Sequence, residues 1–207
     1  MSIAVSALME AEPQGQERPL LVLASSSPRR RELLARLNVA PTRIASPDID
    51  ENPRKGEVPR AYALRMAQEK ARAVKAEPGE IVIAGDTTVA LGRRILDKAH
   101  TDDDVRAMLG KLAGRRHRVF ASVAVADAQG REKSRLSETI VTFKNLSEAE
   151  IEAYVASGEG LGKAGGYAIQ GLAEALIRAL SGSHSGVIGL PLYETRALLR
   201  WAGYPLG

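Results

Sequence analysis

The stretch Leu20–Leu37, LLVLASSSPRRRELLARL, decides how the rest of the chain is interpreted. Its apolar beginning, Leu20–Ala24, predicts a buried strand. Three serines and Pro28 follow, and Pro28 suits the first turn of a helix, where its missing N–H costs nothing. Leucines then recur at helical spacing as far as Leu37. The stretch therefore predicts a strand, a tight polar turn and a helix.

The start of this predicted helix carries Arg29, Arg30 and Arg31 directly after the serine hydroxyls. A helix N-terminus presents unpaired N–H groups and the positive end of the helix dipole, both of which attract anions. Arginines are unfavourable there by themselves, but the guanidinium fork matches phosphate oxygens. Adjacent helical residues point about 100° apart, so only one or two of the three can face the turn. The turn is a candidate phosphate site, and the alternative is a basic first turn on a solvated helix.

The bulk properties narrow the class of protein. A chain of 207 residues is long enough for one sizeable α/β domain or for two lobes that share a cleft. Aromatic residues make up only 4%, which makes a stacking platform for single-stranded nucleic acid unexpected. The net charge of +4 is compatible with an anionic small molecule as well as with nucleic acid. The absence of cysteine excludes disulfides, thiolate metal sites and a cysteine nucleophile. No apolar run approaches the roughly 20 residues of a membrane span, so a cytoplasmic location is expected.

Strand and helix patterns alternate along the chain without a repeat or a clear linker. Residues 1–18 are expected to form a flexible extension, and residues 19–207 a single folded unit. Further strands are expected at 42–45, 81–84, 89–91, 118–127 and 134–143, helices at 59–75, 101–112, 147–157 and 192–202, and a loop at 182–186. This mixture predicts the α/β class with a mixed sheet.

Asp86 has the sharpest chemical signal outside the arginine turn. It follows the apolar run Ile81–Ala84, and we expect it where that strand ends, beside Gly85 and two threonines. Ligands of α/β sheets bind beyond the carboxyl ends of strands, where a carboxylate can hold a metal or accept a proton. The alternative is a turn aspartate that caps backbone N–H groups.

Other charged residues indicate a site only if the fold brings them together. Asp48, Asp50 and Glu51 form an acidic loop that either binds a hard cation or is simply solvated. Lys70 and Lys98 are single lysines, which become interesting if they converge with the arginine turn.

The glycine-dense segment 158–166 resembles a phosphate-binding loop only superficially. Walker spacing requires glycine at 157 and a hydroxyl residue at 164, whereas the chain has Ser157 and Ala164, so a P-loop is rejected. A glycine loop still lets backbone approach a nucleotide closely. Gln170 follows, and its amide carries the donor and acceptor that a pyrimidine edge requires, although a surface polar residue is the alternative.

Taken in order, these motifs resemble the Maf family of nucleoside triphosphate pyrophosphatases over roughly residues 20 to 200. The matching segments are Ser25–Arg30, Asp50–Glu51, Ala67–Ala71, Gly85–Thr87, Ile95–Lys98, Lys163–Gly171 and Gly189–Leu192. The resemblance implies a two-lobed fold like that of the inosine triphosphate pyrophosphatases, with the active cleft between the lobes. It also implies hydrolysis of a nucleoside triphosphate between its α and β phosphates, a divalent cation (Mg²⁺ or Mn²⁺), and a homodimer.

The same resemblance assigns roles to individual residues. Asp86 would accept a proton from the attacking water, and Asp86 and Glu51 would hold the metal. The substrate-binding residues would be Ser25, Arg29, Arg30, Lys70, Thr87, Lys98 and Gln170. Among these, Arg29, Thr87 and Gln170 would distinguish subfamilies by base.

Arg29 directly after Pro28, together with Gln170, matches the branch of this family that acts on dTTP and UTP. The branch that acts on 7-methyl-GTP carries an aromatic residue after that proline and is the first alternative. A non-enzymatic regulator of cell division, binding nucleic acid or protein, is the second, although carboxylates beside the arginines would repel a phosphate backbone. The chain departs from the family at Ala99, usually Pro, which is expected to loosen the loop of Lys98. His184 replaces a usual Tyr, and Gly85 a common Ala.

Overall fold

The computed structural model describes residues 19–206, so the extension expected at residues 1–18 lies outside the described residues. The strands are β1 (Leu20–Leu23), β2 (Arg43–Ile44), β3 (Glu80–Leu91), β4 (Arg94–Leu96), β5 (Arg116–Asp127), β6 (Glu132–Phe143) and β7 (Ile177–Ser181). The helices are α1 (Pro28–Ala35), α2 (Pro59–Ala73), α3 (Asp102–Leu112), α4 (Glu148–Ala156), α5 (His184–Ile188) and α6 (Leu192–Trp201), with a 3₁₀ turn, η1 (Leu172–Leu176). None of these helices has the length and apolarity of a membrane span.

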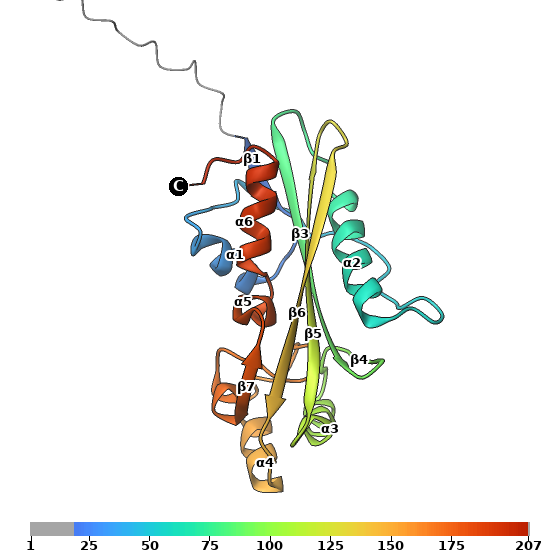
Figure 1. Cartoon of the computed structure of the whole chain (residues 1–207), viewed down its shortest axis with the longest axis vertical. Coiled ribbons are helices and arrows are strands. Elements are labelled where there is room, and N and C mark those ends of the chain that lie inside the picture. The colour runs from blue at the N-terminus through green and yellow to red at the C-terminus, as the bar shows by residue number, and fades with distance from the viewer. Residues whose placement is uncertain (1–18, 207) are drawn as a thin grey trace, which may run out of the picture.

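The strands form one mixed sheet, which confirms the predicted class. Their order is β2-β1-β3-β5-β6-β7, with β4 paired to β3. Strand β1 runs parallel to β2 and β3, whereas the other pairings are antiparallel. Strands β3, β5 and β6 have 12 residues each and extend through most of the molecule (Figure 1).

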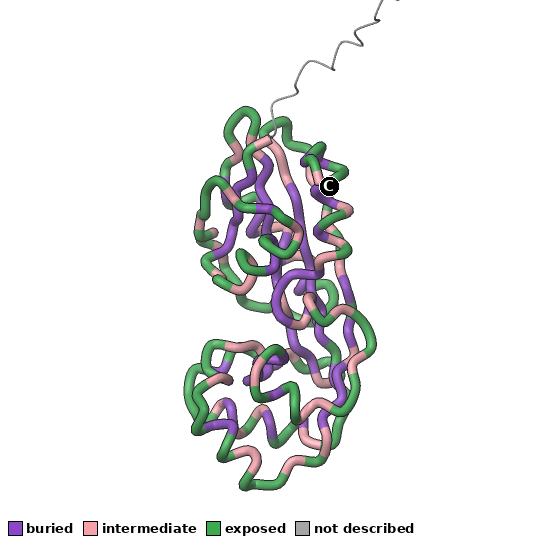
Figure 2. Tube along the Cα trace, turned by 90° about the vertical axis from the view of Figure 1, so that its left-hand side faces the viewer, coloured by how far each residue is buried: buried purple, intermediate pink, exposed green. Residues whose placement is uncertain are grey.

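The helices divide the described chain into two lobes joined by these long strands (Figures 1 and 2). In the upper lobe, α2 covers one face of the sheet, and α1, α5 and α6 cover the other (Figure 1). The lower lobe contains α3, α4, β7 and the glycine-dense segment. The two-lobed α/β arrangement expected from the sequence is therefore present.

Helix α2 lies close to the sheet because small residues face each other across the contact. Ala67 and Ala71 are one helical turn apart and pack against Ala84 and Ala124 of the sheet, all of them buried. Close approach of the helix backbone brings its neighbouring side chain, Lys70, against β3, and Lys70 is only 6% exposed.

Two expectations about local structure were wrong. Gly85–Thr88 does not end a strand but continues β3, with Asp86 directly opposite Ser122 of β5. The long cross-strand pairing overrides the preference of Gly and Asp for turns. The loop expected at 182–186 instead leads into α5, because Ser183 caps it by accepting a hydrogen bond from the Gly186 N–H at 3.0 Å.

Candidate active site

The middle of β3 has an open edge. Strand β1 pairs with β3 only as far as Ile83, and β4 begins to pair at Val89. Among the strands of residues 19–206, residues 84–88 therefore have β5 on one side and none on the other. Successive side chains leave a strand on opposite faces, so Asp86 and Thr87 project differently yet line the same cavity beside this edge.

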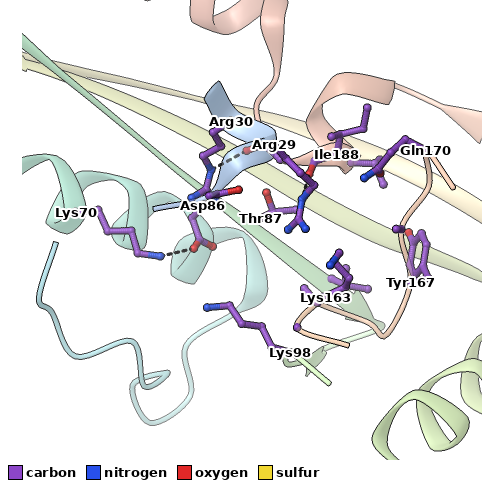
Figure 3. Close-up of a pocket in the computed structure, with 17 residues that line it drawn as sticks. Arg29, Arg30, Lys70, Asp86, Thr87, Lys98, Lys163, Tyr167, Gln170 and Ile188 are labelled. Carbon is purple, nitrogen blue, oxygen red and sulfur yellow. Dashed lines mark hydrogen bonds and ion pairs between the residues drawn. The ribbon is translucent and has the colours of Figure 1, made fainter. Parts of the chain in front are cut away.

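Residues of both lobes line this cavity (Figure 3). The upper lobe contributes Ser27, Arg29, Arg30, Lys70, Asp86, Thr87, Ile188 and Gly189, and the lower lobe Lys98, Lys163, Tyr167 and Gln170. Glu51 lines an adjoining hollow together with Asp86 and Lys98. The lysines that the sequence left open thus converge with the arginine turn.

Backbone carbonyls at the end of α5 fix the arginine turn. Arg30 donates from Nε to the Gly189 carbonyl at 3.0 Å and from Nη1 to the Ser25 hydroxyl at 2.7 Å. Arg29 donates from Nε to the Ile188 carbonyl at 3.2 Å. Burial lowers the pKa of Arg30, and the negative charge of Asp86 opposes that shift. Two of the three arginines face the cavity, as the helical geometry predicted, and Ser25 acts from behind by holding Arg30.

Asp86 is held from both of its oxygens. Oδ1 accepts a hydrogen bond from Lys70 Nζ at 2.9 Å, and Oδ2 accepts one from the Thr88 hydroxyl at 2.9 Å. Asp86 is 6% exposed, as is Lys70. Lys70 Nζ also lies 3.1 Å from Glu51 Oε2, and Lys98 Nζ lies 3.8 Å from the same oxygen. One buried ammonium therefore links the two carboxylates.

The donor chemistry of this pair suits a divalent cation. Asp86 and Glu51 offer carboxylate oxygens that converge on one positive charge, Lys70 Nζ. Within residues 19–206 there is no group of three or more His, Asp or Glu side chains placed to hold a metal. Mg²⁺ is usually bound through one or two carboxylates together with phosphates and water, so two carboxylates are a sufficient protein contribution.

The lower-lobe part of the cavity is built from two loops that hydrogen-bond to each other. Ala99 N–H donates to the Lys163 carbonyl at 3.1 Å, Gly162 N–H donates to the Ala99 carbonyl at 2.8 Å, and Gly165 N–H donates to the Asp97 carbonyl at 3.1 Å. The loosening expected at Ala99 is therefore not found. Ala99 is fully buried and contributes an N–H that a proline would lack.

The segment that carries Gln170 is anchored by two tyrosine hydroxyls. The Tyr167 hydroxyl lies 2.8 Å from His117 Nε2, and the Tyr154 hydroxyl accepts from the Ala168 N–H at 3.0 Å. Thr87 Oγ1 is buried beside the cavity and has no hydrogen-bond partner in the described chain.

Several cavity residues were not among the site residues inferred from the sequence, including Lys163 and Tyr167. Lys163 lies in the glycine-dense segment that failed the Walker pattern, and Tyr167 follows that segment. A lysine inside a glycine-dense loop was the available signal for Lys163. No local pattern pointed to Tyr167, because its role depends on the distant His117.

The family model described as "Maf-like protein" matches residues 20–202. The chain is 64% identical to the "dTTP/UTP pyrophosphatase" of Sphingopyxis alaskensis, over 91% of this chain and 100% of that protein. It is 60% identical to the protein of the same name from Novosphingobium aromaticivorans, over 94% of this chain and 96% of that protein. Among solved structures, the Ham1 protein of Staphylococcus aureus matches with a TM-score of 0.40 at 17% identity, over 59% of this chain and 71% of that chain.

Proposed function

The chain belongs to the Maf-like protein family, and on that premise we propose that it hydrolyses dTTP and UTP to the nucleoside monophosphate and pyrophosphate. The observation that carries this proposal is the convergence of Asp86, Arg30, Lys70 and Lys98 on one cavity at the open edge of β3. Two relatives that match nearly the whole chain bear the name of this activity.

The proposed reaction needs a positioned base and a concentration of positive charge. Asp86 accepts the proton of the attacking water, while Lys70 and Thr88 hold its carboxylate in one orientation. Arg30 and Lys98 neutralise charge that accumulates on the phosphate oxygens during displacement. A triphosphate carries about four negative charges, which explains why several cations surround the single proton acceptor, Asp86.

Asp86 and Glu51 are the residues that would hold a divalent cation, Mg²⁺ or Mn²⁺. When bound, such a cation supplies further charge neutralisation at the phosphate oxygens. Glu51 is suited to bind such a cation because its side chain is 43% exposed and, within residues 19–206, forms ion pairs only with Lys70 and Lys98.

Recognition of the base falls to the opposite side of the cavity. Gln170 offers a donor and an acceptor on one amide, and Thr87 offers a hydroxyl that has no partner in the described chain. Arg29 adds donors that match carbonyl oxygens. These groups favour a pyrimidine with oxygen substituents over a methylated purine, which would need a flat aromatic surface.

The test is a pyrophosphate-release assay with Mg²⁺ on dTTP, UTP, CTP, GTP and 7-methyl-GTP. We expect release chiefly from dTTP and UTP. Repeating the reaction in H₂¹⁸O locates the attack, because attack at the α phosphorus places the label in the monophosphate. Release chiefly from 7-methyl-GTP would assign the chain to the other branch, and no release from any nucleotide would favour the regulatory alternative.

A further inference from the structure

The two sides of the cavity differ in whether carboxylate side chains accompany the cations. On the side of Lys70, the carboxylates of Asp86 and Glu51 accompany the cations. On the other side, Arg29 and Lys163 lie with Gln170, and Asp86 is the only carboxylate among the described residues that line the cavity (Figure 3). Among the lining residues, the second side therefore carries positive charge and no carboxylate, while Glu32 near Arg29 and Glu159 near Lys163 offset part of that charge from outside the lining.

Lys163 is the least committed cation in this set. Its ammonium donates to the Leu161 carbonyl at 3.1 Å and forms no ion pair within residues 19–206, so two of its three donors remain. Burial lowers the pKa of Lys163, and the nearby charge of Arg29 lowers it further. Glu159 opposes that shift, but its carboxylate accepts a hydrogen bond from the Leu172 N–H at 2.8 Å. Two neighbouring cations repel each other unless acceptor oxygens lie between them.

The backbone around Lys163 is held firmly enough to aim this side chain. Its carbonyl accepts from the Ala99 N–H, as described above. Gly165, two residues later, has φ +71°, and a Cβ there would lie 2.8 Å from Val89 Cγ1 on β3. The loop therefore fits closely against the strand that carries Asp86 and Thr87.

The acceptor oxygens that would lie between Arg29 and Lys163 can belong to the pyrimidine base of the substrate. Thymine and uracil have carbonyl oxygens at C2 and C4 with an N–H between them, whereas cytosine has an amino group at C4. Arg29 and Lys163 supply donors beside the Gln170 amide, and this set matches the two carbonyl oxygens of thymine and uracil. An amino group at C4 would set donor against donor, which disfavours cytosine.

We propose that Lys163, together with Arg29, is a specificity-determining residue that donates to the C4 carbonyl oxygen of the base and so favours thymine and uracil over cytosine. The proposal rests on the proposed pyrophosphatase function. It assigns the acid-containing side of the cavity to the triphosphate and the acid-free side to the base.

The experiment compares Lys163→Met with the unchanged protein on dTTP, UTP and dCTP. Loss of one charged hydrogen bond should lower kcat/KM for dTTP and UTP by about 10- to 100-fold and for dCTP by less than about threefold. Lys163→Arg, which keeps a cationic donor, should restore most of the preference. Lys111→Met removes an exposed lysine of α3 and is the matched control, with unchanged kinetics expected.

A second measurement separates a contact with the base from one with phosphate. Inorganic tripolyphosphate has no base, so its inhibition constant should be the same for Lys163→Met and for the unchanged protein. An equal loss on all three nucleotides with weaker tripolyphosphate inhibition would overturn the proposal and assign Lys163 to the phosphates. An unchanged preference would overturn it as well. Failure of the unchanged protein to release pyrophosphate from any nucleotide would instead refute the proposed function.

Discussion

Lys70 and Lys98 both lie near Glu51, yet their surroundings differ sharply. The side chain of Lys70 is 8% exposed and that of Lys98 is 56% exposed. Lys70 stands on a regular helix packed against the sheet and pairs with Asp86, whereas Lys98 belongs to a loop. The Lys70–Asp86 part of the site is thus buried and fixed by secondary structure, whereas the Lys98 side chain is exposed and its loop is held by hydrogen bonds to another loop.

Under the proposed function, this difference separates the residue that reacts from residues that bind the substrate. A reacting carboxylate must keep its geometry to about 0.5 Å, which favours positions on rigid elements. Groups that bind a charged substrate benefit from staying hydrated until it arrives, because burying an unpaired charge is costly. Under the proposed function, the site combines a rigid wall that carries the reacting carboxylate with a more exposed wall that binds substrate.

The largest effect should come from Asp86→Asn, which removes the base and keeps the shape of the rigid wall. We expect kcat to fall by about 10²- to 10⁴-fold, because general base catalysis is lost, with KM changed only a few-fold. Steady-state pyrophosphate release measures both constants. Asp102→Asn, on the exposed first turn of α3, is the control and should be fully active. Full activity of Asp86→Asn would remove Asp86 from the mechanism.

The stability of the two walls should also differ. Lys70→Met leaves the buried Asp86 carboxylate without its ion-pair partner and should lower the free energy of unfolding by about 3 to 5 kcal/mol. Lys98→Met removes an exposed charge and should cost less than about 1 kcal/mol. Urea denaturation of both variants tests the contrast. Equal losses would show that the exposed wall is as firmly built as the buried one.

The residues of the site were predictable where the signal is local. Arg29 and Arg30 follow a helix-starting proline, so their position on the first turn of α1 could be inferred from the sequence alone. Asp86 was identified as chemically important, but its backbone was misjudged, because Gly-Asp-Thr-Thr suggests a turn. Only the pairing with β5, supplied by residues distant in sequence, keeps the segment extended.

The lower wall was less predictable for the same physical reason. Lys163 comes into place through backbone hydrogen bonds with residues 97–99, and no spacing within the glycine-dense segment reveals that pairing. Ala99 is a second example of a contact that local sequence does not reveal. Alanine at this position has a backbone N–H that proline lacks, and its hydrogen-bond acceptor, the Lys163 carbonyl, lies on another loop. Local patterns identified the residue types of this wall but not how its loops meet.

His117 gives the lower wall a buried, titratable anchor beneath Tyr167. Burial lowers the pKa of His117 to about 4, from about 6.5 in the unfolded chain. Between these values the unfolded chain binds a proton that the folded chain excludes, so stability falls as the pH drops from about 6.5 to 4. The loss is at most about 3 kcal/mol and is constant below that window.

Denaturation of His117→Gln at several pH values measures this contribution. The variant should be less stable at pH 7, because the contact with Tyr167 is changed, but its stability should vary less between pH 7 and 5. Glu57 and Glu150, whose pKa values are lowered to about 2 by hydrogen bonds from Arg65 and Lys144, affect stability mainly below that range. His100→Gln, at an exposed position, is the matched control for the loss of a histidine. An unchanged slope in His117→Gln would contradict the assignment.

The smallest and most local effect concerns two glycines of the lower wall. Gly162 and Gly165 have φ values of +69° and +71°, so alanine at either position costs roughly 1 kcal/mol of backbone strain. At Gly162 no atom of the described chain beyond the adjacent residues lies within 4 Å of an added Cβ, whereas at Gly165 Val89 Cγ1 lies 2.8 Å away. Gly165→Ala should therefore push the loop from β3 and raise KM several-fold, while Gly162→Ala should alter thermal stability alone. Equal KM values in the two variants would show that the loop shifts without moving Lys163, so that the exposed wall tolerates displacements that the rigid wall does not.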